Sequence, residues 1–132
     1  MIVLDASAAV ESLIGEGAAG RRVLQRLRDL HRIHVPELFD LEVMSAIRRA
    51  ERSDKITEAA AVQALSHVAG LRAERWRHEE LLPEAWRRRH RHSTYNAVYV
   101  ALAKLLDLPL VTVDRRLAAS AADDVAVELL VA

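Results

Sequence analysis

Four polar side chains in this sequence are candidates for hydrolytic chemistry. Asp5 and Asp114 each follow a short apolar run, residues 2–4 and 110–113, whereas Glu42 lies in an amphipathic segment and Asn96 at the head of an apolar one. Carboxylates that lie close together are usually compensated by a divalent cation, and Mg²⁺ and Mn²⁺ prefer oxygen ligands. We therefore expect a metal site that could activate water and cleave a phosphodiester.

Each of these four residues also has a purely structural interpretation. Asp5 and Asp114 both precede an expected helix and could serve as N-terminal caps. Glu42 could be an ordinary solvated position on a helix. Asn96 could form hydrogen bonds with the local backbone at a helix N-terminus. Taken singly, the residues leave both interpretations open.

Two hydroxyl groups accompany the aspartates. Ser7 lies two residues after Asp5, and Thr112 lies two residues before Asp114. These hydroxyls could orient a carboxylate or a metal-bound water. They could equally be a helix cap and a hydroxyl on the face of a strand.

The hydrophobic pattern predicts how these side chains are positioned. We expect strands at 2–4, 34–35, 110–113 and 125–131, with a possible edge strand within 71–77, and helices at 6–14, 18–30, 36–52, 58–68, 84–91 and 93–104, followed by a short Ala-rich helix after Asp114. Apolar runs without alternation, joined by helices, predict a mostly parallel sheet flanked by helices, in one α/β domain. If the strands that end at Asp5 and Asp114 are neighbours, their carboxylates converge.

Composition narrows the class of protein. The chain has 132 residues, 52% of them hydrophobic and 29% charged, with no cysteine and a formal net charge of zero. This composition predicts a folded domain without disulfides or thiolate metal sites. No apolar run approaches the roughly 20 residues that span a membrane, so we expect a cytoplasmic protein.

Positive charge is concentrated in one part of the chain. Residues 72–92 contain seven arginines and four glutamates. Four of these arginines, with Trp86 nearby, form a patch suited to RNA phosphates: Arg87, Arg88, Arg89 and Arg91. A solvated helix face is the alternative explanation.

Three segments, MIVLDASAAV, VPELFDLEVMSAIRR and YNAVYVALAKLLDLPLVTVDRRLA, resemble the PIN-domain ribonucleases, and within them the VapC toxins of toxin-antitoxin pairs. The resemblance runs from end to end and implies one PIN-like α/β/α sandwich over residues 1–132. It implies that Asp5, Glu42 and Asp114 bind catalytic Mg²⁺ or Mn²⁺, supported by Ser7 and Thr112. It further implies an endoribonuclease that cuts structured RNA (tRNA or rRNA), forms a homodimer and is inhibited by a VapB-type antitoxin.

Asn96 departs from the family pattern, which usually has aspartate there. An amide keeps the shape and one acceptor oxygen but removes a negative charge, and it cannot take a proton from water at neutral pH. We therefore expect weaker metal binding and slower cleavage than in an Asn96→Asp variant. Whether Asn96 is natural or engineered, and whether one or two metals bind, are left open.

Two other functions are considered. Asn96 favours a PIN-fold protein that binds RNA or its antitoxin without cutting. A small-molecule phosphatase with an aspartate nucleophile needs a second aspartate two residues on, and Ser7 occupies that position after Asp5. The sequence therefore argues against the phosphatase.

Overall fold

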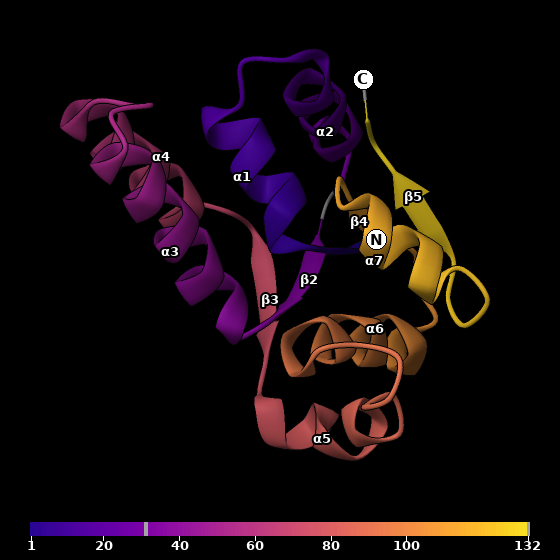
Figure 1. Ribbon diagram of the computed structural model, residues 1–132. Coiled ribbons are helices and arrows are strands. Elements are labelled where there is room, and N and C mark those ends of the chain that lie inside the picture. Colours follow the sequence, from indigo (N-terminus) through magenta and orange to yellow (C-terminus); the bar gives the residue numbers. More distant parts are fainter. Residues whose placement is uncertain (31, 132) are drawn as a thin grey trace.

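A five-stranded parallel sheet, with strand order β3-β2-β1-β4-β5, forms the centre of the protein (Figure 1). The computed structural model describes residues 1–30 and 32–131. The strands are β1 (Ile2–Leu4), β2 (Ile33–Pro36), β3 (Ala73–Trp76), β4 (Leu110–Thr112) and β5 (Val127–Leu129). The chain runs from β1 outward to β3 and then returns to β4 on the other side of β1, so the strand order reverses between β1 and β4. In parallel α/β sheets, ligands bind beyond the carboxyl ends of the strands at such a reversal.

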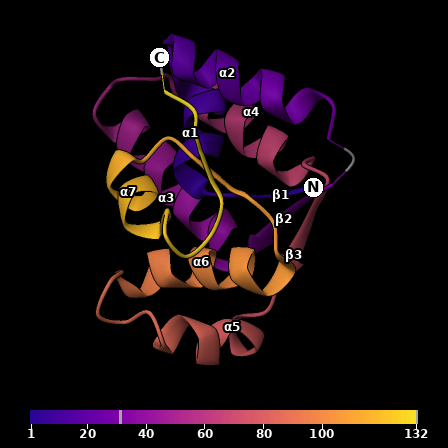
Figure 2. The ribbon, with the colours of Figure 1, turned by 90° about the vertical axis from the view of Figure 1, so that its right-hand side faces the viewer.

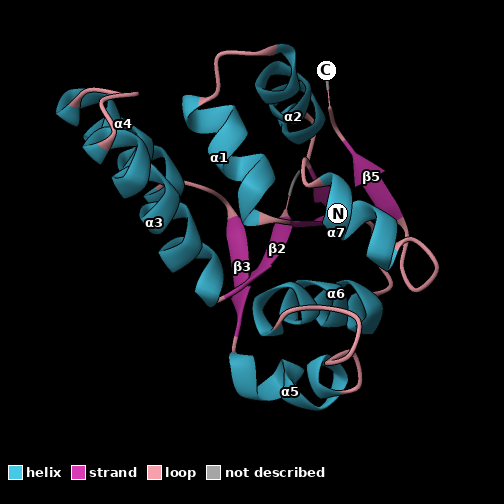
Figure 3. Ribbon diagram, viewed as in Figure 1, coloured by secondary structure: helices cyan, strands magenta, loops and turns pink. Residues whose placement is uncertain are grey.

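Helices connect the strands and cover both faces of the sheet (Figures 2 and 3). They are α1 (Ala6–Ile14), α2 (Ala18–Arg28), α3 (Leu38–Arg52), α4 (Glu58–Ala69), α5 (His78–Trp86), α6 (Thr94–Leu106) and α7 (Arg115–Ala121). In Figure 2, α2 and α4 lie on one side of the sheet, and α6, with α5 outside it, lies on the other. Every residue of β1, β2 and β4 is buried, which explains why these strands are apolar without alternation. The predicted α/β sandwich with a mostly parallel sheet is confirmed.

Helix α6 is buried along most of its length. Residues 97–103 are all buried, because the helix lies between the sheet and α5. Ser93 caps its N-terminus by accepting a hydrogen bond of 3.3 Å from the backbone N–H of Asn96. At its other end, Asp107 takes a left-handed backbone conformation. The apolar run after Asn96 therefore belongs to the core, and Asn96 itself lies in the first turn of α6.

Two prolines occupy positions other than those predicted. Pro36 was expected to begin a helix, but it ends β2, where it is paired with Trp76. The paired positions of β1 and β2 stop at Val3 and His34, so the missing N–H of Pro36 interrupts no bond to β1. Pro83 immediately precedes the expected helix 84–91 and was expected to open it, but it lies inside α5.

Smaller differences concern the ends of elements. Helix α5 begins at His78, with Glu79 and Glu80 in its first turn, where acidic side chains complement the helix dipole. The predicted helix 84–91 is therefore wrong in its bounds, because residues 87–91 follow α5 as turns. The edge strand expected within 71–77 is confirmed as β3, whereas β5 is shorter than the expected 125–131.

Candidate active site

Asp5 ends β1, and two hydroxyl groups hold its side chain. Ser7 Oγ donates a hydrogen bond to Oδ2 of Asp5, and Thr112 Oγ1 donates another to the same oxygen at 2.8 Å. Asp5 occupies the N-cap position of α1, yet its carboxylate makes no capping hydrogen bond to that helix. The structural interpretation of Asp5 as a cap is therefore wrong. Its carboxylate is instead fixed from β4 and from the first turn of α1.

Asp114 follows β4, which is the immediate neighbour of β1, so the adjacency that the sequence left open is present. Its Oδ1 accepts hydrogen bonds from the backbone N–H groups of Arg116 at 2.9 Å and Leu117 at 3.1 Å. Asp114 is therefore the N-cap of α7. Because both bonds go to Oδ1, capping fixes the carboxylate while Oδ2 takes no part in it.

Glu42 reaches the same region from α3, and it faces the hydroxyl of Tyr99 on α6. Oε1 of Glu42 and the hydroxyl of Tyr99 are both buried, and neither has a hydrogen-bond partner among the described residues. Tyr99 lies three residues after Asn96, on the same side of α6. A half-buried carboxylate with an unpartnered oxygen is costly in the absence of a ligand. The solvated interpretation of Glu42 does not hold.

These groups surround one cavity of about 1020 Å³ beyond the carboxyl ends of β1 and β4. Asp5, Glu42, Asn96 and Asp114 all line it, as does Ser7. The backbone N–H of Asn96 bonds to Ser93, while its side chain faces the cavity. The structure therefore brings together all four residues singled out from the sequence.

Burial shapes the electrostatics of this cavity. Burial raises the pKa of Asp5 above its ordinary value, against the hydrogen bonds from Ser7 and Thr112, and the negative charge of Asp114 raises it further. Burial also raises the pKa of Glu42, where the Tyr99 hydroxyl acts in the opposite direction and the charge of Asp5 adds to the rise. Both carboxyl groups would be ionised more readily with a cation beside them.

The donor set fits a hard divalent cation in its chemistry. The side chains at the acidic end of the cavity offer oxygen atoms, and the buried Oε1 of Glu42 lacks a partner within the described part of the chain. However, residues 1–30 and 32–131 contain no group of three or more His, Asp or Glu side chains close enough to share one metal ion. The three acids therefore line a common cavity without already forming a coordination sphere.

The predicted arginine patch lies elsewhere. Arg88 is paired with Asp124 and Glu84, Arg87 with Glu84, and Arg91 with Asp123. Arg89 lies over the ring of Trp86, with 4.5 Å between its guanidinium carbon and the ring centroid. None of the four arginines lines the cavity of the acids. Much of their charge is balanced by carboxylates within the fold.

Sequence reasoning missed two features near the acids. Tyr99, which is fully buried behind Glu42, was not singled out, although a hydroxyl three residues from Asn96 was the available signal. Arg49 lines the cavity together with Arg48, Arg52 and Lys55. Because Arg49 lies seven residues after Glu42, it is on the same face of α3, and this spacing could have revealed it.

Comparison with known proteins identifies the family. The PIN domain family model matches residues 2–123. The chain belongs to the PIN-domain family. Among PIN-domain proteins, it is 44% identical over 119 residues to Ribonuclease VapC1 of Mycobacterium tuberculosis, a match that covers 89% of each chain. It is 38% identical over 130 residues to Ribonuclease VapC12 of the same organism, covering 98% of this chain and 99% of the relative. The resemblance to VapC proteins is thereby confirmed.

Solved structures agree with the PIN fold. The crystal structure of PAE2754 from Pyrobaculum aerophilum superposes with a TM-score of 0.64 at 24% identity, covering 96% of this chain and 81% of that one. Mycobacterium tuberculosis VapC20, described as a sarcin-ricin loop cleaving toxin, superposes with a TM-score of 0.67 at 18% identity, covering 91% and 95%. At these identities the likeness concerns the fold alone.

Proposed function

We propose that this PIN-domain protein is a metal-dependent endoribonuclease and the toxin of a type II toxin-antitoxin pair. The observation that carries the proposal is the cavity in which Asp5, Glu42 and Asp114 converge from β1, α3 and β4. Its relatives VapC1 and VapC12 are named ribonucleases, which supports RNA as the substrate. Within the proposal, the substrate is structured RNA, either tRNA or rRNA, and the location is the cytoplasm.

Asp5, Glu42, Asp114 and the oxygen of Asn96 are the proposed ligands of one or two Mg²⁺ or Mn²⁺ ions. When bound, such an ion lowers the pKa of water and stabilises a leaving oxygen. The chain itself supplies orientation. Ser7 and Thr112 hold Asp5, and the helix cap holds Asp114. The buried oxygen of Glu42 needs no desolvation when a cation arrives, because it is already out of water.

Asn96 limits both the binding of a cation and the activation of water. Its side-chain oxygen can face a cation, but the neutral amide contributes no charge and accepts no proton from a water nucleophile at neutral pH. An Asn96→Asp variant should therefore bind Mg²⁺ more tightly and cleave RNA faster than the parent chain.

The test compares the parent with Asn96→Asp, free of antitoxin, on total RNA in Mg²⁺ or Mn²⁺ and in EDTA. Adding Asp5→Ala to the Asn96→Asp variant provides the matched loss-of-site control. Cleavage that needs the cation and disappears with Asp5→Ala supports the proposal. Equal cleavage by parent and Asn96→Asp would show that a fourth carboxylate is dispensable, and cleavage that persists with Asp5→Ala would contradict the acid-cluster mechanism.

A second candidate is a PIN-fold protein that binds RNA or an antitoxin without cutting, and the observation that favours it is Asn96 itself. The two functions differ in their dependence on metal. RNA binding that persists in EDTA, with no product from either the parent or Asn96→Asp in Mg²⁺ or Mn²⁺, would favour the binding protein.

Two partners complete the proposal. A VapB-type antitoxin would inhibit the protein by placing a basic group among the acids, where it offsets their charge. A second copy of the chain would form the homodimer. Exposed Leu41, Leu82 and Tyr95 surround an apolar groove of about 680 Å³ between α3, α5 and α6, which gives a second copy apolar surface to bury. Light scattering across a range of protein concentrations tests the dimer.

Among the described residues, no helix is long and apolar enough to cross a membrane.

A further inference from the structure

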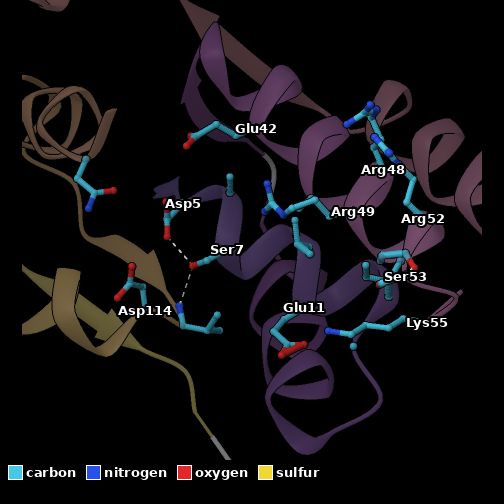
Figure 4. A pocket seen from close by; sticks show the side chains of 18 residues that line it. Asp5, Ser7, Glu11, Glu42, Arg48, Arg49, Arg52, Ser53, Lys55 and Asp114 are labelled. Carbon is cyan, nitrogen blue, oxygen red and sulfur yellow. Dashed lines mark hydrogen bonds between the residues drawn. The ribbon is translucent and has the colours of Figure 1, made fainter. Parts of the chain in front are cut away.

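The cavity that contains the acids is electrically polarised. Four acidic and four basic side chains line it: Asp5, Glu11, Glu42 and Asp114, and Arg48, Arg49, Arg52 and Lys55. Figure 4 shows Asp5, Glu42 and Asp114 towards one end, whereas the basic side chains extend from α3 and the turn after it towards the other. We call the four basic residues the basic wall. A ligand that fills the whole cavity meets three acids at one end and, at the other, four cations with the acid Glu11 beside Lys55.

Ion pairing within the fold does not explain the basic wall. None of its four members forms an ion pair with any described residue; the terminal N–H of Arg49 donates a hydrogen bond of 3.2 Å to Ser45. Glu11 lines the same cavity but lies beyond salt-bridge distance of Lys55. By contrast, Arg88, which follows α5 and lies outside this cavity, is paired with two carboxylates. The charges of the basic wall remain available to a ligand.

The helix alone does not account for these cations either. The C-terminal dipole of α3 favours basic residues in its last turn. However, Arg48 and Arg52 are four residues apart, and Arg49 and Arg52 are three apart, so each pair brings like charges together on the helix surface and destabilises it. A single arginine would satisfy the dipole without this repulsion. The repeated cations are therefore better explained by a ligand that carries several negative charges.

The spacing along α3 indicates which kind of ligand. Glu42 and Arg49 are seven residues apart and line the same cavity, so about 10 Å of helix axis separates them. A ligand that reaches both ends must carry a negative group about that far from the group that meets the acids. The phosphodiester chain has an anion at every nucleotide, and guanidinium groups bind phosphate oxygens in a bidentate manner.

We propose that the basic wall binds phosphates of the RNA chain that flank the phosphodiester held at the acids. The inference rests on the proposed ribonuclease function and adds a binding subsite to it. An acidic protein segment is another polyanion that could lie there. RNA is favoured because the basic wall and the three acids share one cavity, so a single continuous chain can occupy both ends.

The test uses the double variant Arg49→Gln/Arg52→Gln and, as its matched control, Arg87→Gln/Arg89→Gln. Both variants remove two exposed arginines, but only the first removes them from the cavity. Binding of a fluorescent single-stranded RNA and of tRNA is measured in EDTA at several salt concentrations, and circular dichroism confirms that each variant is folded. Each lost phosphate contact should reduce the slope of log affinity against log salt by about 0.7. We expect the cavity variant to lose about 1.4 in slope and about tenfold in affinity at low salt, while the control is unchanged.

The outcomes separate this inference from the proposed function. If the parent and its Asn96→Asp form neither bind nor cleave RNA, both proposals are wrong. If cleavage occurs but the cavity variant keeps the affinity and salt slope of the parent, only the assignment of the basic wall is wrong. A polyglutamate peptide serves as the second probe. Loss of its binding by the cavity variant, with RNA binding retained, would assign the basic wall to an acidic protein segment and overturn the RNA subsite.

Discussion

Thr112 Oγ1 donates a hydrogen bond of 2.8 Å to Oδ2 of Asp5, and the same hydroxyl oxygen accepts one of 3.0 Å from the backbone N–H of Asp114. Thr112 is fully buried, so neither bond competes with water. One hydroxyl therefore ties the ends of β1 and β4 together and sets the relative placement of the two aspartates. Polar groups behind metal-binding side chains commonly have this orienting role.

Replacing Thr112 with valine tests this role, because valine keeps the shape and removes the hydroxyl. We expect cleavage of RNA and affinity for Mg²⁺ to fall by about 10- to 100-fold. The free energy of unfolding should fall by about 1–3 kcal/mol, because the N–H of Asp114 loses its buried partner. Thr57→Val is the matched control. Thr57 caps α4 and does not line the cavity, so its loss should lower stability by about 1 kcal/mol and leave cleavage intact. Equal loss of cleavage in both variants would assign Thr112 to stability alone.

The raised pKa of Asp5 predicts an unusual dependence of stability on pH. Because the folded chain holds this proton to a higher pH than the unfolded chain, the free energy of unfolding falls as pH rises from the ordinary value of 3.8 through the raised pKa, and it stays reduced above that. In EDTA at neutral pH, Asp5→Asn should therefore melt at a higher temperature than the parent. The difference should shrink as pH falls below the ordinary value.

Addition of Mg²⁺ should reverse this order. The parent gains stability by binding a cation in the folded state only, and Asp5→Asn loses a charged ligand and gains less. Thermal melts with and without Mg²⁺ at neutral pH check both halves of the prediction. If Asp5→Asn is less stable than the parent in EDTA at neutral pH, burial does not penalise the Asp5 carboxylate as its raised pKa implies.

The ends of these two strands were predictable, because each apolar run is short and stops directly at an aspartate, Asp5 or Asp114. Whether the two strands are neighbours was left open by the sequence, and it is the pairing of β1 with β4 that brings the two aspartates to one edge. Glu42 was harder to assign from the sequence, because a glutamate on an amphipathic helix is usually exposed to solvent. Its burial depends partly on Tyr99, which reaches it from α6, and no local sequence pattern contains this tertiary contact.

The basic residues show where local charge counting fails. The run from Arg87 to Arg91 stands out in the sequence, but its partners Asp123 and Asp124 come from a distant segment and balance it. The cations on α3 stand out less in the sequence, yet they line the cavity without ion-pair partners among the described residues. Pairing across the fold, rather than the density of charge along the chain, determines which arginines are available.

Tyr99 offers a third prediction, because its buried hydroxyl faces Glu42 without a hydrogen-bond partner in the described structure. Burial raises the pKa of this phenol far above its ordinary value, so the group is neutral at any physiological pH. Tyr99→Phe keeps the buried ring and removes only the hydroxyl. Because the hydroxyl also lowers the pKa of Glu42, its loss should shift the acid limb of the pH profile for cleavage to higher pH.

The comparison variant for this position is Tyr95→Phe, since Tyr95 is exposed and lies outside the cavity of the acids. It should change neither stability nor the pH profile. A Tyr99→Phe variant whose acid limb coincides with that of the parent would show that the phenol does not act on Glu42.

Arg88 should contribute to stability rather than to RNA binding. Its half-buried guanidinium donates to both carboxylate oxygens of Asp124, at 2.6 and 3.1 Å, and to Oε2 of Glu84 at 2.8 Å. It therefore joins the end of α5 to the segment between α7 and β5. Arg88→Ala should lower the free energy of unfolding by about 2 kcal/mol at neutral pH, because Asp124 and Glu84 each lose their shortest ion pair.

The effect of Arg88→Ala should depend on pH in a defined direction. The hydrogen bond from Arg88 lowers the pKa of Asp124 and that of Glu84, so the stability it provides is complete above their ordinary values and is lost as pH falls through the lowered ones. Urea unfolding at neutral and acid pH measures the change. Arg87→Ala is the control, because Arg87 is largely exposed and forms one surface pair with Glu84. RNA affinity, measured well below the melting temperature, should be unchanged in both variants. If Arg88→Ala instead keeps its stability and loses RNA affinity, the arginines after α5 are the RNA contact, and the basic wall of α3 is not needed to explain binding.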